Sequence, residues 1–214
     1  MVKAGMRPMQ RLGSGMKSLG FALLLPIALT GCSNGGSGWH GTNITGSVPS
    51  LAFDMKRADT GANVDGEDFR GHVTALYFGY TYCPDICPIT LSNMGRALQR
   101  MGDAAKNVRV LFVTVDPRRD TPAEVEKYVK AFGPQFVGLT GSEDQLARVA
   151  KRYRVAYSVS PDPDPAKYEV THSSALFIFD RHGEARLLEN SLSTDKPDIA
   201  GVADDLTRLV SEKD

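Results

Sequence analysis

Residues 73–88 read VTALYFGYTYCPDICP, and the expected order of elements follows from this stretch. Its first seven residues form an apolar run of strand length, which predicts a buried strand. Pro84 disfavours helical backbone angles at Cys83, whereas Pro88 suits the first position of a helix. The stretch therefore predicts a buried strand, then a loop that carries Cys83, then a helix with Cys87 at its entrance.

The sequence on either side alternates between strand and helix patterns. Further strands are expected at 50–54, 108–115, 136–139, 155–159, 174–179 and 184–188, and helices at 88–101, 121–132, 142–153 and 197–212. Two capping boxes, Thr121 with Glu124 and Ser142 with Gln145, mark the starts of the second and third helices. The alternation, closed by a hairpin and a last helix, predicts an α/β fold with a central mixed β-sheet flanked by helices.

The N-terminus has the pattern of a targeting segment. Four basic residues precede an apolar stretch at 19–30, which is too short for a transmembrane helix. The stretch ends in Leu29-Thr30-Gly31-Cys32, which resembles a bacterial lipobox and implies cleavage before Cys32 and acylation of that residue. An uncleaved short anchor with an incidental cysteine is the alternative. We therefore expect a lipoprotein signal peptide at 1–31, a Gly/Ser-rich flexible tether at 32–47 and one folded domain at 48–214.

Composition excludes one class of partner. Lys+Arg and Asp+Glu both total 25, but the first 31 residues contain Lys3, Arg7, Arg11 and Lys17 and no acid. The rest of the chain is therefore mildly acidic, and no basic patch for a nucleic acid is expected.

Cys83 and Cys87 are the residues with the clearest chemical signal. Both lie near the positive end of the expected helix dipole, which favours the thiolate form that binds metals and acts as a nucleophile. The aromatic residues Tyr77, Phe78, Tyr80 and Tyr82 are expected to limit the access of water. Helical residues four apart have Cβ atoms about 5–6 Å apart, whereas a disulfide needs about 3.8 Å. A metal or redox role is therefore favoured over a structural disulfide.

A third ligand has to come from elsewhere in the chain. Of the four histidines, His40 lies in the expected tether, His72 precedes a strand and His182 lies in a hairpin turn, whereas His172 immediately precedes the apolar run at 175–179. Two thiolates and an imidazole suit copper in either oxidation state. Zinc accepts the same donors and stays open at this point.

Three motifs together resemble the Sco/SenC family of copper chaperones. They are YFGYTYCPDICP at 77–88, VDPRRDTP at 115–122 and THS at 171–173, and the similarity spans about 48–212. The resemblance implies a thioredoxin-like fold in which Cys83, Cys87 and His172 bind Cu(I) or Cu(II). It also places Asp116 near the site, either behind the metal ligands, where it would act on them without touching the metal, or as the start of a turn.

The same resemblance implies delivery of copper to the binuclear copper centre of cytochrome c oxidase subunit II, or reduction of that centre's cysteines. Other copper chaperones or thiol reductants are then expected partners. The expected location is extracytoplasmic, facing the periplasm, with the lipid of Cys32 in the membrane, by default the cytoplasmic membrane.

Two enzyme functions compete with copper delivery. Cys83 and Cys87 could act as a thiol–disulfide oxidoreductase, although their spacing has one residue more than that of ordinary thioredoxins. A peroxiredoxin-like peroxidase is disfavoured because the folded domain contains no resolving cysteine beyond the pair. Whether the protein is an enzyme stays open from sequence.

Overall fold

The structure, a computed structural model, describes residues 38–160, 162, 164, 168 and 170–212. The expected signal peptide and Cys32 lie outside the described residues. Among those described, no helix has the length and apolar character needed to cross a membrane.

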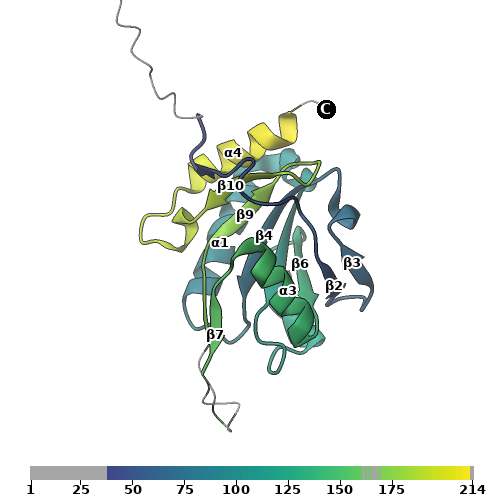
Figure 1. The fold of residues 1–214 in the computed structure, drawn as a ribbon. Coiled ribbons are helices and arrows are strands. Elements are labelled where there is room, and N and C mark those ends of the chain that lie inside the picture. Colours follow the sequence, from purple (N-terminus) through teal and green to yellow (C-terminus); the bar gives the residue numbers. More distant parts are fainter. Residues whose placement is uncertain (1–37, 161, 163, 165–167, 169, 213–214) are drawn as a thin grey trace, which may run out of the picture. The chain divides into compact units, whose positions relative to one another are not determined.

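The central strand is β4 (Val73–Gly79), and all seven of its residues are buried. It pairs in parallel with β5 (Val108–Thr114), which pairs in parallel with β6 (Phe136–Thr140). On its other side lies the antiparallel hairpin of β9 (Leu176–Phe179) and β10 (Ala185–Glu189). The sheet also contains β1 (Thr42–Asn43), β2 (Asp54–Arg57) and β3 (Asn63–Asp65). The strand order of the eight-stranded sheet is β1-β10-β9-β4-β5-β6-β2-β3, so the expected mixed sheet is confirmed (Figure 1).

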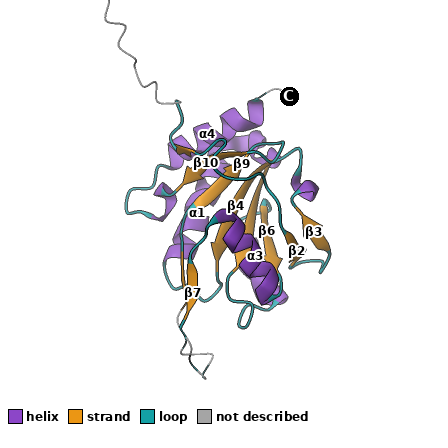
Figure 2. Ribbon diagram, in the orientation of Figure 1, coloured by secondary structure: helices purple, strands orange, loops and turns teal. Residues whose placement is uncertain are grey.

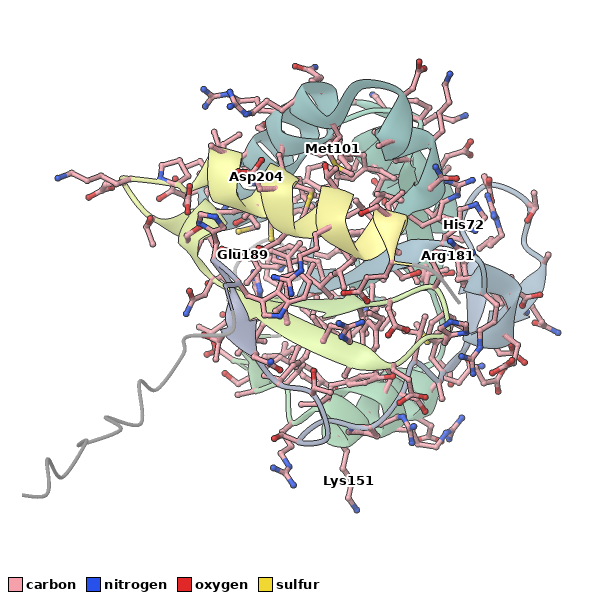
Figure 3. The ribbon with its side chains drawn as sticks, turned by 90° about the horizontal axis from the view of Figure 1, so that it is seen from above. His72, Met101, Lys151, Arg181, Glu189 and Asp204 are labelled. Atoms are coloured by element: carbon pink, nitrogen blue, oxygen red, sulfur yellow. The ribbon has the colours of Figure 1, made fainter. Side chains whose placement is uncertain are left out.

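Helices cover both faces of this sheet. One face packs against α1 (Ile86–Met101), α2 (Pro122–Lys130) and α4 (Ile199–Ser211), and the other packs against α3 (Glu143–Tyr153). Figure 2 shows α3 in front of the sheet and α1 behind it. In Figure 3, Asp204 on α4 and Lys151 on α3 lie on opposite sides of the β9–β10 hairpin. Burial of both faces explains why β4 has no polar alternation.

The expected helix boundaries agree with the structure to within about two residues, and the difference at Pro88 has a local cause. Both predicted capping boxes are present, at Thr121 and at Ser142. The helix expected to begin at Pro88 begins instead at Ile86, so Pro88 is its third residue. A proline is compatible with this position, because the first backbone N–H groups of a helix have no intrahelical partner.

Several strands differ from the expectation. The early strand lies at Asp54–Arg57 (β2) rather than 50–54, and it pairs with β3 (Asn63–Asp65). The strand expected at 155–159 is β7 (Tyr157–Val159), which pairs only with β8 (Val170–His172). The sequence did not indicate β8 as a strand, because its three residues have no apolar alternation.

The expected flexible tether at 32–47 is wrong for its second half. Strand β1 (Thr42–Asn43) pairs with β10, and the backbone N–H groups of His40 and Gly41 donate to the buried carboxylate of Asp205 at 3.0 and 2.8 Å. The guanidinium of Arg208 lies 3.7 Å from the ring centre of Trp39. Residues 39–47 therefore belong to the folded body, because their backbone groups find partners that a Gly-rich composition does not reveal.

Candidate metal centre

Cys83 and Cys87 lie where β4 passes into α1. Cys83 is half-buried on the connecting loop, as expected, and Cys87 is fully buried in the first turn of α1. The backbone N–H of Cys87 points at Sγ of Cys83, 3.4 Å away. Both are free thiols in this structure, so no disulfide joins them.

Gly79, the last residue of β4, makes room for the buried sulfur. A Cβ atom at this position would lie 2.8 Å from Sγ of Cys87 and 2.8 Å from the Phe112 ring. Any side chain would therefore push Cys87 out of place.

His172 approaches the pair from β8. Its Nε2 lies 3.2 Å from Sγ of Cys87, 85 residues away in sequence. The ligand atoms of Cys83, Cys87 and His172 all lie within 4.8 Å of one another. Nδ1 of His172 lies 2.9 Å from the carbonyl oxygen of Ser173, which can only accept a hydrogen bond. The proton therefore sits on Nδ1, and the lone pair of Nε2 points towards the sulfurs, as in metal-ligating histidines.

The pKa values of the two cysteines are shifted in opposite directions. The hydrogen bond from the Cys87 thiol lowers the pKa of Cys83 to about 3, against the opposing effect of its partial burial. The same bond and deep burial raise the pKa of Cys87. In the metal-free pair the thiolate that the helix terminus favours therefore lies on Cys83 and the proton on Cys87, because two adjacent sulfurs do not both carry charge at low cost.

Two of the four aromatic residues form the wall of the site. The ring of Tyr77 stands edge-on to His172 at 6.0 Å, and that of Tyr80 at 5.7 Å. The Tyr77 hydroxyl also points at Sγ of Cys87, 3.6 Å away. Phe78 packs instead into the core on the opposite face of the sheet, and Tyr82 is 55% exposed. Neither of the latter two shields the sulfurs.

The three donors meet at the rim of a pocket of about 320 Å³. Cys83 and His172 line it, whereas Cys87 forms no part of its lining. The arrangement fits a soft metal ion, since it offers two sulfur donors and one imidazole with its tautomer already set. It is also open on one side, so a second molecule can approach the ion.

Asp116 does not join the three candidate donors but contacts Arg119 and Tyr168. Its carboxylate is almost fully buried, lies 2.5 Å from Nε of Arg119 and accepts a hydrogen bond from the Tyr168 hydroxyl. Sequence reasoning missed Arg119 and Tyr168, because a search for metal donors considers thiol, imidazole and carboxylate side chains and leaves out guanidinium and phenol groups. The only available signal for Arg119 was its place in the 115–122 motif.

The other histidines lie outside the donor group. Nδ1 of His40 lies 3.1 Å from the carboxylate of Asp198, His72 lies just before β4, and His182 lies in the turn between β9 and β10.

Comparisons with known proteins agree with this geometry. The family model described as SCO1/SenC matches residues 52–210, well over half of the chain. A SCO2-like protein of Rickettsia felis is 36% identical over 66% of this chain and 70% of its own length. The mitochondrial SCO2 homologue of Bos taurus is 43% identical over 54% of this chain, but the match spans only 44% of that protein.

Solved structures of Sco proteins are also similar to this chain. ScoI of Bradyrhizobium japonicum with copper bound is 34% identical, has a TM-score of 0.65, and the match covers 74% of this chain and 98% of that one. The copper-bound ScoI of Arabidopsis thaliana is 31% identical with a TM-score of 0.66, covering 75% and 97%. These likenesses establish the thioredoxin-like fold expected above. With the family match over residues 52–210, they show that the chain belongs to the SCO1/SenC family.

Proposed function

We propose that this protein is a copper metallochaperone that holds copper through Cys83, Cys87 and His172. The observation that carries the proposal is the convergence of these three donors within 4.8 Å at the rim of an open pocket. Copper is favoured over zinc because two related proteins with the same fold contain copper in their structures, and because soft thiolates suit Cu(I).

An open three-donor site suits transfer better than storage. Cys83 and His172 line the pocket, so an incoming thiol or imidazole reaches the ion from their side. Cys87 lies behind them, holds its proton in the metal-free pair, and must release that proton when copper binds. Copper would then leave by ligand exchange, with Cys87 as the last protein ligand to let go.

The recipient that we propose is the binuclear copper centre of cytochrome c oxidase subunit II, which the protein would load or otherwise mature. One solved structure that shares this fold, at 22% identity, is of BsSco, which is described as a member of the Sco family of cytochrome c oxidase assembly proteins.

We further propose that Cys32 is lipidated and anchors the protein to a membrane, with the folded domain on the extracytoplasmic side. Mass spectrometry of the native protein should find an acylated Cys32 at the N-terminus, and an intact Met1 start would contradict this.

Thiol–disulfide oxidoreduction is the second candidate, and the depressed pKa of Cys83 favours it. A half-exposed thiolate beside a buried thiol can attack a disulfide. The two functions differ in what the histidine contributes, since His172 is a metal ligand in the first and is dispensable for the second.

The test is copper loading of the reduced full chain in detergent. We expect one copper per chain, strong sulfur-to-copper absorption with Cu(II), and loss of that absorption in the His172→Ala variant. Transfer of the copper to a purified subunit II fragment completes the assignment. Absence of copper binding together with disulfide reductase turnover that survives His172→Ala would replace the chaperone proposal with the oxidoreductase.

A further inference from the structure

His172 reaches the cysteines from a ribbon that lies outside the main sheet. Strands β7 and β8 pair with each other alone among the described residues, and β7 stands apart from the eight-stranded sheet in Figure 1. The chain runs from His172 into β9 within four residues, so one end of the ribbon is tied to the sheet. Side chains must hold the rest of the ribbon against the cysteine loop.

Arg119 makes that connection. Its guanidinium carbon lies 3.8 Å from the ring centre of Tyr168, and its Nη1 donates to the Tyr168 carbonyl oxygen at 3.2 Å. The same guanidinium lies 5.3 Å from the ring centre of Tyr82 and 5.8 Å from that of Tyr80. Tyr168 leads into β8, whereas Tyr80 and Tyr82 lie on the cysteine loop. One cation therefore contacts both parts of the site.

Asp116 fixes the direction of this guanidinium. The Asp116 side chain is 2% exposed and the Arg119 side chain 12%, and Nε lies 2.5 Å from the carboxylate. The other carboxylate oxygen accepts the Tyr168 hydroxyl proton in a hydrogen bond. Tyr168 is thus held at its ring face, its carbonyl oxygen and its hydroxyl by two residues of the 116–119 turn.

The contacts made by Arg119 extend to the imidazole of His172 through Tyr168 and Tyr80. Tyr168 precedes His172 by four residues, and the ring of Tyr80 stands edge-on to the imidazole at 5.7 Å. We propose that Arg119 is a positioning residue that, oriented by Asp116 and stacked on Tyr168, sets the place of the His172 imidazole relative to Cys83 and Cys87. The inference rests on the proposed function and deepens it, since it names Arg119 as the side chain that positions the third copper ligand, His172.

The chemistry requires arginine rather than any cation. Only a planar guanidinium can stack on one ring while it donates in its own plane to a carboxylate and a carbonyl oxygen, and a lysine ammonium cannot do this. A buried ion pair also contributes little net stability compared with well-packed apolar side chains. Arg119→Lys therefore keeps the charge while removing the stacking and the fork of hydrogen bonds.

The first measurement needs no copper. In the reduced full chain in detergent micelles, labelled at tyrosine and histidine, NMR should show proton contacts between the Tyr80 and His172 rings. We expect Arg119→Lys to lose or weaken these contacts. Arg208→Lys is the matched control, because Arg208 stacks on Trp39 at 3.7 Å and makes no described contact with the donor residues. Retention of the contacts in Arg119→Lys would overturn the proposal whether or not the protein binds copper.

The second measurement uses copper. Arg119→Lys should bind Cu(II) about tenfold more weakly, which corresponds to about 1.4 kcal/mol, and its absorption spectrum should shift towards that of His172→Ala. Because Arg119 acts through His172, the double variant should bind no more weakly than His172→Ala alone. Additive losses would overturn the proposal. If wild type binds no copper while the ring contacts still depend on Arg119, the proposed function fails and the positioning role stands.

A second variant covers the case in which Arg119→Lys does not fold. Tyr168→Phe removes only the hydroxyl that donates to Asp116 and keeps the ring beneath Arg119. We expect the same changes in ring contacts and spectrum, in the same direction and smaller. An unchanged spectrum together with unchanged ring contacts in this variant would contradict the proposed role.

Discussion

At the scale of single residues, one proton decides the chemistry of the cysteine pair. The hydrogen bond to Cys83, followed by deep burial, raises the pKa of Cys87, so Cys87 keeps the proton; the same hydrogen bond lowers the pKa of Cys83 and holds it as a thiolate. The half-exposed sulfur of Cys83 is therefore the reactive one, and the buried sulfur of Cys87 becomes a ligand only when copper displaces its proton. This division follows from the hydrogen bond between the two sulfurs and from the deeper burial of Cys87, since both cysteines lie near the same helix terminus.

The first prediction concerns the reactivity of Cys83 in the reduced, metal-free protein. Since its pKa is lowered to about 3, the thiolate persists at every higher pH. Alkylation of Cys83 by iodoacetamide should therefore proceed at nearly the same rate at pH 8 and at pH 5, and fall only as the pH approaches 3. Mass spectrometry of quenched samples measures the rate, and Cys87 should stay unmodified.

Two variants at Cys87 serve as controls for this prediction. Cys87→Ala removes the hydrogen-bond donor, so alkylation of Cys83 should fall steeply below pH 8, as for an ordinary thiol. Cys87→Ser keeps a donor and should retain much of the flat profile. A tenfold drop per pH unit below pH 8 in wild type would show that Cys83 is an ordinary thiol.

The second prediction concerns Gly79. A Cβ atom there would meet Sγ of Cys87 and the Phe112 ring, both at 2.8 Å. Gly79→Ala should destabilise the protein by about 1–3 kcal/mol, as overpacking does, and weaken copper binding by displacing Cys87. Chemical denaturation and copper titration measure the two effects. In Gly41→Ala the nearest atom would be 3.4 Å away, so both quantities should change little. Equal behaviour of the two variants would contradict the argument.

At the scale of elements, the N-terminal segment is the part that changes most from its expected role. Residues 39–43, with Trp39 over Arg208, act as a strap along α4 and β10. The strap leaves residues 32–38 between the proposed lipid on Cys32 and the folded body.

The third prediction tests the strap. Asp205→Ala removes the carboxylate that accepts from the backbone of His40 and Gly41, and a hydrogen bond to a charged group is worth about 1.5–3 kcal/mol. Hydrogen exchange of peptides covering 39–43 should become faster, with copper binding unchanged. Asp204→Ala, one residue earlier and on the exposed side of α4 (Figure 3), is the matched control. Unchanged exchange in Asp205→Ala would show that the strap is held by other contacts.

At the scale of the whole molecule, the proposed copper site would join three elements that are separate in sequence. The loop after β4, the first turn of α1 and the β8 strand each carry one of the three candidate donors. A ligand that binds only the folded state stabilises it by mass action. Copper should therefore stabilise the fold as a whole rather than one helix.

The fourth prediction is a shift in thermal unfolding. Copper at about 100 times its dissociation constant adds about 2.7 kcal/mol. That corresponds to a rise of about 5–10 °C in Tm for a chain of this size. Differential scanning calorimetry of the reduced protein measures the shift, a chelator should reverse it, and His172→Ala should show a smaller rise. An unchanged Tm with saturating copper would exclude a site formed only by the native fold.

Local sequence patterns are enough to predict the fold class, the buried β4 strand, both capping boxes and the placement of Cys83 on a loop before Cys87 at a helix start. These features follow from local periodicity, proline geometry and capping, which act over a few residues. The similarity of three motifs to the Sco/SenC family also supplied the pairing of His172 with the cysteines. No local rule gives that pairing.

Three other features arise only when distant segments pack together. The separation of the two cysteine pKa values depends on the hydrogen bond between their sulfurs and on the burial of Cys87, and the strap at 39–43 depends on Asp205, more than 160 residues away. The placement of Arg119 between Tyr168 and the cysteine loop depends on two segments that meet only after folding. The physical reason is the same in each case: electrostatic and packing energies depend on distance in space, which the order of residues along the chain does not specify.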